Sequence, residues 1–554
     1  MAGWLRKRGI DVALVVAIWA FTGLLNGSEP WVSFDTPDSE FHASMAVFGS
    51  DVTDRAALPV YFWTRIGYIA PAHFLTQILG PMPGLEVYRL LLLAVIVACL
   101  FVTLRSFTGR FNATILTLLV GANTVLLGYL GNPYPTATVM SAIFAVIALA
   151  IRGNRWIWHF VAGGVLGWLV MTSPFGAMLG AVAYLSALLS RNKWTFQPRG
   201  LLAWAGSVAA GATFTFGALW LVGRWLFPGL DWLGTYLYWN SALNQADYIY
   251  ELWRWVYDPS MLVPAMAAVI GLISIAVNPG NTGTRIGGVL ALTTPAFAFA
   301  YWWFLPNNYL EIPHYQAMLF PVALSAMALI AASRLPDVPL TWTRGAAAAG
   351  LVGLSILAGH ATPNLSVWQA RLVAILAVVV FIAPWGKRWV ALATAVAITF
   401  ASAQLLQNAR DNFGVSTTRL YANAYLANEA EAMMSSAIAA ESWVLAKTQP
   451  GDRVLTWYDG GVQWVSDQAL LPLAAFQIWG ANTAARAPTP TPDDIKNLEW
   501  RKPLAIAMYG KTMSAVLTFW NGLPKQWRPT PPECKPVPWP QTESALVCVT
   551  YLNW

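Results

Sequence analysis

The chain has 554 residues, of which 57% are hydrophobic and 11% are charged, and its mean hydropathy is +0.51. This composition excludes an ordinary water-soluble protein and a disordered one, and it indicates an integral membrane protein. The net charge of +7 is spread over short connections between apolar segments, so we expect no nucleic-acid partner.

Apolar segments of spanning length recur through the first 406 residues. A helix that crosses a bilayer needs roughly 20 mostly apolar residues. This pattern predicts a transmembrane module over residues 1–406 with about thirteen helices. We expect them near 10–26, 86–104, 112–129, 135–151, 156–172, 175–190, 203–226, 259–277, 286–304, 314–333, 345–359, 367–385 and 389–406.

Basic residues occupy alternate connections between these spans, whereas the short connections near 130–134, 173–174, 305–313 and 360–366 contain no Lys or Arg. The basic connections carry Arg6, Lys7, Arg8, Arg105, Arg110, Arg152, Arg155, Arg191, Lys193, Arg199, Arg285, Arg334, Arg344, Lys387 and Arg388. Because loops rich in Lys and Arg face the cytoplasm, we expect a cytoplasmic N-terminus and an extracytoplasmic C-terminus.

The segment FDTPDSEF, which follows the first apolar span, contains Asp35, Asp38 and Glu40. No cleavage site is apparent after that span, so we interpret it as a retained helix followed by an extracytoplasmic loop over 27–85. Carboxylates beside a bilayer carry a high desolvation penalty, which makes this cluster a functional-site hypothesis. The alternative is that they are solvated loop residues, with Asp35 and Ser39 capping a helix.

Within the same loop, the apolar segment 59–81 contains Arg65, Pro71 and His73. A helix lying along the membrane surface fits this pattern better than a further span.

The composition changes after residue 406, where Pro and polar residues increase and no further span occurs. We expect residues 407–554 to form a soluble extracytoplasmic α/β domain. Its strands are predicted at DRVLTWY, PLAIAMYG and ALVCVTYL, and its helices at LANEAEAMMSSAIAAESWVLAK and KTMSAVLTFWNGL. APTPTPDD and RPTPPECKPVPWP are interpreted as Pro-rich loops. Cys534 and Cys548 are predicted to form a disulfide in an oxidising compartment, whereas Cys99 is expected to pack within a membrane helix.

The predicted organisation of the chain resembles that of the GT-C glycosyltransferases. The shared features are an acidic first loop, a surface helix, the sequence LEVYRLLLL at the start of the second span, many further spans and an outer C-terminal domain. The resemblance is to the group that uses lipid-phosphate sugars, which includes protein mannosyltransferases, aminoarabinose transferases and arabinofuranosyltransferases of actinobacterial cell walls. Its recognisable pattern covers Phe34 to Leu104. The family's adjacent acidic pair is matched here by PDSEFHASMA, in which one residue separates Asp38 from Glu40.

This resemblance implies a polytopic GT-C fold and an inverting transfer of a sugar, such as arabinofuranose or mannose, from a polyprenyl-phosphate donor. The acceptor would be a glycan, lipid or protein of the cell envelope. High Ala, Trp and Arg usage favours a GC-rich bacterium, and hence its plasma membrane. The transfer needs a base for the acceptor proton: Asp38 is the first choice and Asp35 the second. Glu40 would orient the acceptor or hold a divalent cation such as Mg²⁺ or Ca²⁺, together with Asp35.

The departing phosphate needs cationic partners near the outer membrane surface. The candidates are Arg65, Arg89, His314 and Arg371. Arg89 and Arg371 also fit side chains that simply extend toward lipid headgroups, and His314 fits an ordinary interfacial histidine.

Acceptor contacts are predicted in two polar, aromatic connections. One contains Tyr309 and Glu311, and the other, a loop over 231–258, contains Trp239 and Asp247. Aromatic faces stack on sugars, but Trp and Tyr also gather at any membrane interface.

Two other classes of function stay open at this stage. A transporter or flippase of lipid-linked glycans also has many spans, although it usually carries ionisable residues near the bilayer midplane. The second open class is a catalytically inactive scaffold whose outer domain binds carbohydrate. The sequence has no Walker A motif, Rossmann fingerprint or zinc-ligand spacing, which disfavours an ATP-driven pump and direct use of a nucleotide sugar.

Overall fold

The computed structural model describes residues 2–25, 42, 45–46, 64–121, 123–130, 134–153, 155–192, 198–227, 231–243, 259–304, 313–334, 443, 446–449, 452–458, 461–467, 492, 495–496, 499, 505–510, 513–539 and 542–554. The helices predicted near 345–359, 367–385 and 389–406 lie outside these residues, as does most of the helix predicted at LANEAEAMMSSAIAAESWVLAK.

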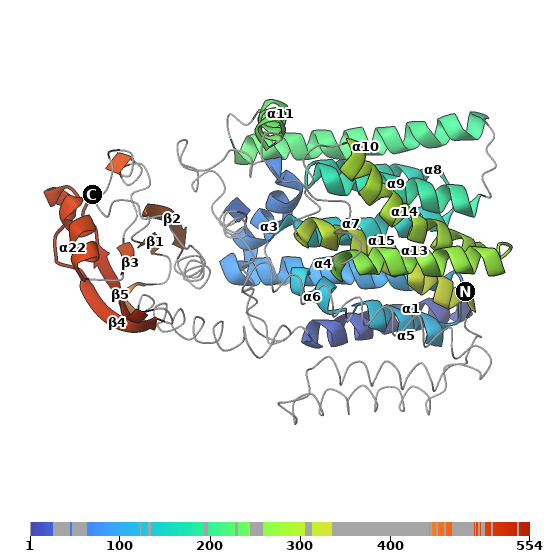
Figure 1. Cartoon of the computed structure of the whole chain (residues 1–554), viewed down its shortest axis with the longest axis horizontal. Coiled ribbons are helices and arrows are strands. Elements are labelled where there is room, and N and C mark those ends of the chain that lie inside the picture. The colour runs from blue at the N-terminus through green and yellow to red at the C-terminus, as the bar shows by residue number, and fades with distance from the viewer. Residues whose placement is uncertain are drawn as a thin grey trace, which may run out of the picture.

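A bundle of apolar helices forms the first part of the chain (Figure 1). Its helices are α1 (Ala2–Leu25), α3 (Ile66–Leu79), α4 (Pro81–Arg105), α5 (Arg110–Gly121), α6 (Thr124–Leu130), α7 (Pro135–Arg152), α8 (Trp156–Val170), α9 (Pro174–Arg191), α10 (Pro198–Leu226), α11 (Trp232–Leu243), α13 (Pro259–Val277), α14 (Thr282–Phe304) and α15 (Pro313–Arg334). Several begin with Pro, whose missing N–H is tolerated in the first turn.

Among the described helices, five are long and apolar enough to cross a membrane. They are Pro83–Arg105, Pro135–Arg152, Leu202–Leu226, Thr282–Trp303 and Tyr315–Arg334. Helix α15 lies in the middle of the bundle and is almost wholly buried, whereas α10 lies at its edge (Figure 1). The chain is a multi-pass membrane protein.

The span predicted near 112–129 is divided into two helices, α5 and α6. Helix α5 ends at Gly121, and the side-chain oxygen of Asn123 accepts a hydrogen bond from Leu126 N at 3.3 Å. Gly disfavours the helix interior, and Asn competes with the backbone for hydrogen bonds and therefore caps a new helix instead. The expectation of one continuous span is corrected accordingly.

The chain ends in a five-stranded mixed sheet with the strand order β2-β1-β3-β5-β4. Its elements are β1 (Arg453–Tyr458), β2 (Gly461–Asp467), β3 (Ala505–Gly510), α22 (Met513–Gly522), β4 (Glu533–Trp539) and β5 (Thr542–Tyr551). Strands β1, β3 and β5 and helix α22 lie where the sequence predicts them. An apolar cluster that includes Val516 and Phe519 of α22 packs with Cys548 of β5.

The segment RPTPPECKPVPWP, predicted to be a loop, contains strand β4. Pro536 and Pro538 lack a backbone N–H, but β4 pairs only with β5 and forms an edge of the sheet, where Pro is tolerated. Cys534 lies opposite Cys548 across this pair, and a disulfide joins them. Cys99 is a half-buried free thiol that packs against the core of the bundle.

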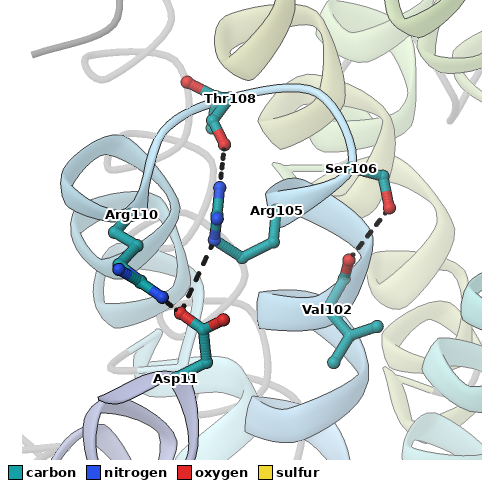
Figure 2. Close-up of polar contacts among 6 residues, drawn as sticks. All are labelled: Asp11, Val102, Arg105, Ser106, Thr108 and Arg110. Atoms are coloured by element: carbon teal, nitrogen blue, oxygen red, sulfur yellow. Dashed lines mark hydrogen bonds and ion pairs between the residues drawn. The ribbon is translucent and has the colours of Figure 1, made fainter. Parts of the chain in front are cut away.

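Basic side chains fix the ends of several helices at one end of the bundle. Figure 2 shows Asp11 of α1 between Arg105, which ends α4, and Arg110, which begins α5. The Arg110 Nε to Asp11 Oδ1 distance is 2.6 Å, and Arg105 Nη1 donates to the carbonyl oxygen of Thr108 at 2.6 Å. This network ties the start of α1 to the turn between α4 and α5.

Two further arginines form hydrogen bonds between helices at the same end of the bundle as Arg105. Arg285 of α14 donates to the Ser190 carbonyl of α9 at 2.7 Å, and Arg334 of α15 donates to the Ser274 carbonyl of α13 at 3.1 Å. At Gly283, beside Arg285, an added Cβ would lie within 3 Å of both Phe107 in the α4–α5 turn and Ser333 of α15. Arg105, Arg110, Arg285 and Arg334, which belong to basic connections that the sequence assigns to one side of the membrane, therefore lie at one end of the bundle.

Candidate functional site

The end of the bundle opposite the basic one holds α3, the turn between α8 and α9, and the starts of α4 and α7. Helices α4 and α7 run in parallel, because the Tyr88 hydroxyl lies 2.9 Å from Thr138 Oγ1 and Ser141 Oγ donates to the Leu92 carbonyl at 3.2 Å. Their starts therefore lie together, away from Arg105. This end is the one at which α1 finishes and the first loop begins.

Helix α3 is hydrogen-bonded to the turn that joins α8 and α9. Gly67 N donates to the Met171 carbonyl at 2.8 Å, and Trp168 Nε1 donates to the Gly67 carbonyl at 2.5 Å. Arg65 Nη1 donates to the Thr172 carbonyl at 3.1 Å, with the Arg65 residue only 5% exposed. Arg65 is thus a buried cation held at the first turn of α3 rather than a solvated surface residue.

Helix α11 reaches the start of α3 through Trp232, whose Nε1 donates to the Thr64 carbonyl at 2.9 Å. Trp232 stacks on Tyr236 with ring centroids 5.3 Å apart. Trp239 lies on the same face of α11, three residues beyond Tyr236, but its side chain is outside the described part. The loop predicted over 231–258 is therefore helical in its first half, where Asp231 caps α11 by accepting from Gly234 N at 3.0 Å.

The sequence just after the first-loop acids packs against these helices. His42 is buried, and its ring makes edge contacts with Tyr68 at 5.8 Å and Tyr134 at 5.1 Å between centroids. The Ala46 carbonyl accepts a hydrogen bond from Thr76 Oγ1 of α3 at 2.8 Å. The described part of the first loop is therefore anchored at the same end as Arg65.

Tyr68 is the residue that the sequence reasoning missed. Its side chain is fully buried between His42 and Tyr88, and its hydroxyl has no hydrogen-bond partner among the described residues. Burial raises the pKa of the Tyr68 phenol well above its usual value, so the group stays protonated and can donate. The available signal was its position three residues after Arg65, which places both on one face of α3.

Arg89 is also buried, in the early turns of α4, and it forms an ion pair with Glu86. The alternative that Arg89 merely extends toward lipid headgroups does not describe this side chain, because the guanidinium is enclosed. Glu86 lies within the segment LEVYRLLLL, at the start of the second predicted span.

His314 lies in the first turn of α15, and its side chain is outside the described part of the chain. Its neighbour Tyr315 contacts Phe175 of α9 with ring centroids 5.3 Å apart. Phe175 follows Thr172 by three residues, so the start of α15 shares an end of the bundle with Arg65.

The structure therefore brings Arg65, Arg89 and the backbone of His314 to one end of the bundle. The remaining predicted site residues lie outside the described residues: Asp35, Asp38, Glu40, Asp247, Tyr309, Glu311 and Arg371. Within the described part of the chain, no group of three or more His, Cys, Asp or Glu side chains could hold a metal ion.

No protein-family model and no curated protein matches the sequence, but solved structures do. ArnT from Cupriavidus metallidurans bound to undecaprenyl phosphate matches with a TM-score of 0.53 at 12% identity, covering 98% of both chains. ArnT from the same organism in the apo state gives a TM-score of 0.49 at 13% identity, covering 99% of this chain and 98% of that chain. The Archaeoglobus fulgidus oligosaccharyltransferase tethered with an acceptor peptide gives a TM-score of 0.38 at 11% identity, covering 91% of this chain and 69% of that chain.

The chain has the GT-C fold. The match to ArnT covers nearly the whole of both chains, including the helical bundle and the C-terminal sheet. The fold class predicted from the acidic first loop, the surface helix and the outer C-terminal domain is confirmed.

Proposed function

We propose that the protein is an inverting membrane glycosyltransferase that moves a sugar from a polyprenyl-phosphate donor to an acceptor in the cell envelope. The observation that carries this proposal is the presence of two buried arginines, Arg65 and Arg89, at the end of a GT-C bundle where the acidic first loop begins. Buried cations at headgroup depth are suited to a lipid-borne phosphate. The bound undecaprenyl phosphate of the ArnT structure supports the same class of donor.

Asp38 is proposed as the base that takes the acceptor proton, with Asp35 as the second choice. In the sequence, Asp38 precedes the anchored His42 by four residues, a stretch that spans at most about 14 Å when fully extended. The proposal therefore puts Asp38 at the same end as Tyr68 and Arg65. Glu40 would orient the acceptor or hold a divalent cation, either Mg²⁺ or Ca²⁺, with Asp35.

The reaction breaks the bond between the sugar C1 and the phosphate oxygen and forms a bond from C1 to the acceptor oxygen. The acceptor proton passes to the carboxylate of the base, and the bond electrons leave with the phosphate. Arg65 and Arg89, with His314 and Arg371 as further proposed ligands, would stabilise the charge that grows on this phosphate. Fixed cations act strongly there because the site is partly dehydrated.

The remaining parts of the proposal concern orientation and substrates. Residues 1–406 would form the transmembrane module and residues 407–554 the extracytoplasmic domain, with the N-terminus in the cytoplasm of a bacterium. The basic end of the bundle, with Arg105, Arg285 and Arg334, would face the cytoplasm. Tyr309, Glu311, Trp239 and Asp247 are proposed acceptor contacts, and arabinofuranose or mannose is the proposed sugar.

The decisive experiment measures sugar transfer by the purified protein and by its Asp38→Asn variant. A panel of polyprenyl-phosphate sugars and cell-envelope acceptors is supplied, and products are detected by mass spectrometry. Loss of the base should lower turnover by at least about a hundredfold while the protein still folds. Asp35→Asn serves as the paired variant, because an active Asp38→Asn with an inactive Asp35→Asn would move the role to Asp35. Full activity in both would refute a first-loop base, and movement of intact lipid-linked glycan without transfer would favour a flippase.

A further inference from the structure

Glu86 and Arg89 form an ion pair three residues apart on one face of α4. The two partners differ in exposure: the Arg89 side chain is 5% exposed, and that of Glu86 is 36% exposed. Removing the anion beside a buried guanidinium leaves an uncompensated buried charge, and here the anion is the more exposed of the two partners.

The pair lies where the first loop leaves the bundle. Gly23 of α1 packs on α4, since an added Cβ there would lie 3.5 Å from Leu90 and 4.0 Å from Leu93. Arg89 lies one helical turn before Leu93, on the same face of α4 and further toward the site end. Leu25, the last residue of α1, follows Gly23 by two residues. Arg89 and Glu86 therefore lie at the level at which the chain leaves α1 for the acidic loop.

The proposed reaction changes the charge of the ligand at this position. The donor is a phosphodiester with one negative charge, whereas the product is a phosphate monoester that carries close to two at neutral pH. Arg89 attracts both species. Glu86 repels both, and it repels the product more, because the Coulomb energy scales with the ligand charge.

We propose that Glu86 is a built-in competitor for Arg89, which lowers the affinity of the site for the polyprenyl-phosphate product relative to the donor and so promotes product release. This inference rests on the proposed function. Glu86 acts through its negative charge beside Arg89 and does not itself contact the reacting atoms. A purely structural ion pair would stabilise α4 but would not distinguish a monoester from a diester.

The test compares two lipids that differ in charge at the phosphate, undecaprenyl phosphate and its methyl phosphodiester. Their binding to the full-length protein in nanodiscs is measured for the wild type and for Glu86→Gln. The variant should bind the monoester at least about tenfold more tightly and should gain less affinity for the diester, so the monoester-to-diester affinity ratio rises. Product inhibition during turnover should strengthen in parallel.

Three controls accompany this comparison. Glu86→Asp keeps the charge and should keep the wild-type ratio, and it remains informative if Glu86→Gln folds poorly. Arg89→Gln should weaken the binding of both lipids. Glu533→Gln makes the same chemical change in a different ion pair, with Lys447 of the C-terminal part, and should leave both affinities unchanged.

An unchanged ratio in Glu86→Gln, with both lipids still bound and still weakened by Arg89→Gln, would overturn the role of Glu86 alone. Failure of the wild type to bind either lipid would instead overturn the proposed function together with this inference.

Discussion

Replacing Gly67 with Ala tests whether the contact between α3 and the α8–α9 turn holds the site together. An ideal Cβ at Gly67 would lie 2.1 Å from Thr172 Oγ1 and 2.9 Å from the carbonyl oxygen of Trp168, whereas ordinary contacts begin at 3.4 Å. Thr172 cannot turn away freely, because its Oγ1 donates to the Trp168 carbonyl at 2.8 Å. Helix α3 must therefore shift by roughly 1 Å.

That shift disturbs the hydrogen bonds from Gly67 N to Met171, from Trp168 to Gly67 and from Arg65 to Thr172. The two neutral hydrogen bonds are each worth about 0.5–1.5 kcal/mol net and the one from the charged Arg65 about 1.5–3 kcal/mol, and overpacking adds about 1–3 kcal/mol. Because the neighbouring side chains relax in part, we expect the free energy of unfolding to fall by roughly 2–4 kcal/mol. Sugar transfer should fall by about a hundredfold, since a misplacement of about 1 Å at a reacting centre has that effect.

The assay combines thermal unfolding of the detergent-solubilised protein with sugar transfer under donor saturation. Gly206→Ala is the matched control, because an added Cβ on this residue of α10 meets no atom within 4 Å. Ala is the better helix former by about 1 kcal/mol, so the control should keep full activity and unfold at the same or a higher temperature. Wild-type stability and turnover in Gly67→Ala would refute the reasoning.

Two further predictions concern single groups. Tyr68→Phe should lower donor use by roughly tenfold. The unfolding temperature should not fall, because no described residue forms a hydrogen bond with the hydroxyl that the substitution removes. A lower unfolding temperature with full activity would make the hydroxyl purely structural. The double variant Cys534→Ser/Cys548→Ser should destabilise the sheet by roughly 3 kcal/mol in the loop-entropy model, as seen by faster hydrogen exchange in β4 and β5 of the intact protein. Equal exchange rates would contradict a stabilising bridge across this strand pair.

Long apolar helices were predicted well because burial in lipid or in a bundle demands a run of apolar residues. The expected spans near 135–151, 175–190 and 314–333 match α7, α9 and α15 to within a residue or two. A hydropathy pattern cannot show a break inside an apolar segment, however. The separation of α5 from α6 depends on Gly121 and on the capping amide of Asn123, two residues whose effect is averaged out in a hydropathy window of about 19 residues.

Strand β4 was missed for a related reason. Its prolines are evidence against a strand only if the strand has neighbours on both sides, and the sequence does not show that β4 lies at an edge. The pairing of Cys534 with Cys548 was predictable because only these two of the three cysteines lie in the C-terminal part.

The sequence indicates which types of residue to expect in the candidate site, but it does not show which side chains contact one another there. Arg65 and Arg89 are predicted from the sequence as cations near the outer membrane surface, yet their burial depends on contacts that the sequence does not show, such as that of Arg65 with the distant Thr172. The environment of the Tyr68 hydroxyl is harder still to foresee, because an aromatic residue in an apolar segment is usually an interfacial or core residue. Only the fold shows that its hydroxyl is enclosed.

The position at which α1 ends follows from two contacts along the helix. Near its start, Asp11 is bound by Arg105 and Arg110, and further along Trp19 Nε1 donates to the Leu90 carbonyl at 2.9 Å. A slip of one residue along α4 would shift α1 by 1.5 Å and break both contacts. The basic end therefore does more than indicate orientation: through the rigid length of α1, it fixes where the chain leaves the bundle beside Arg89.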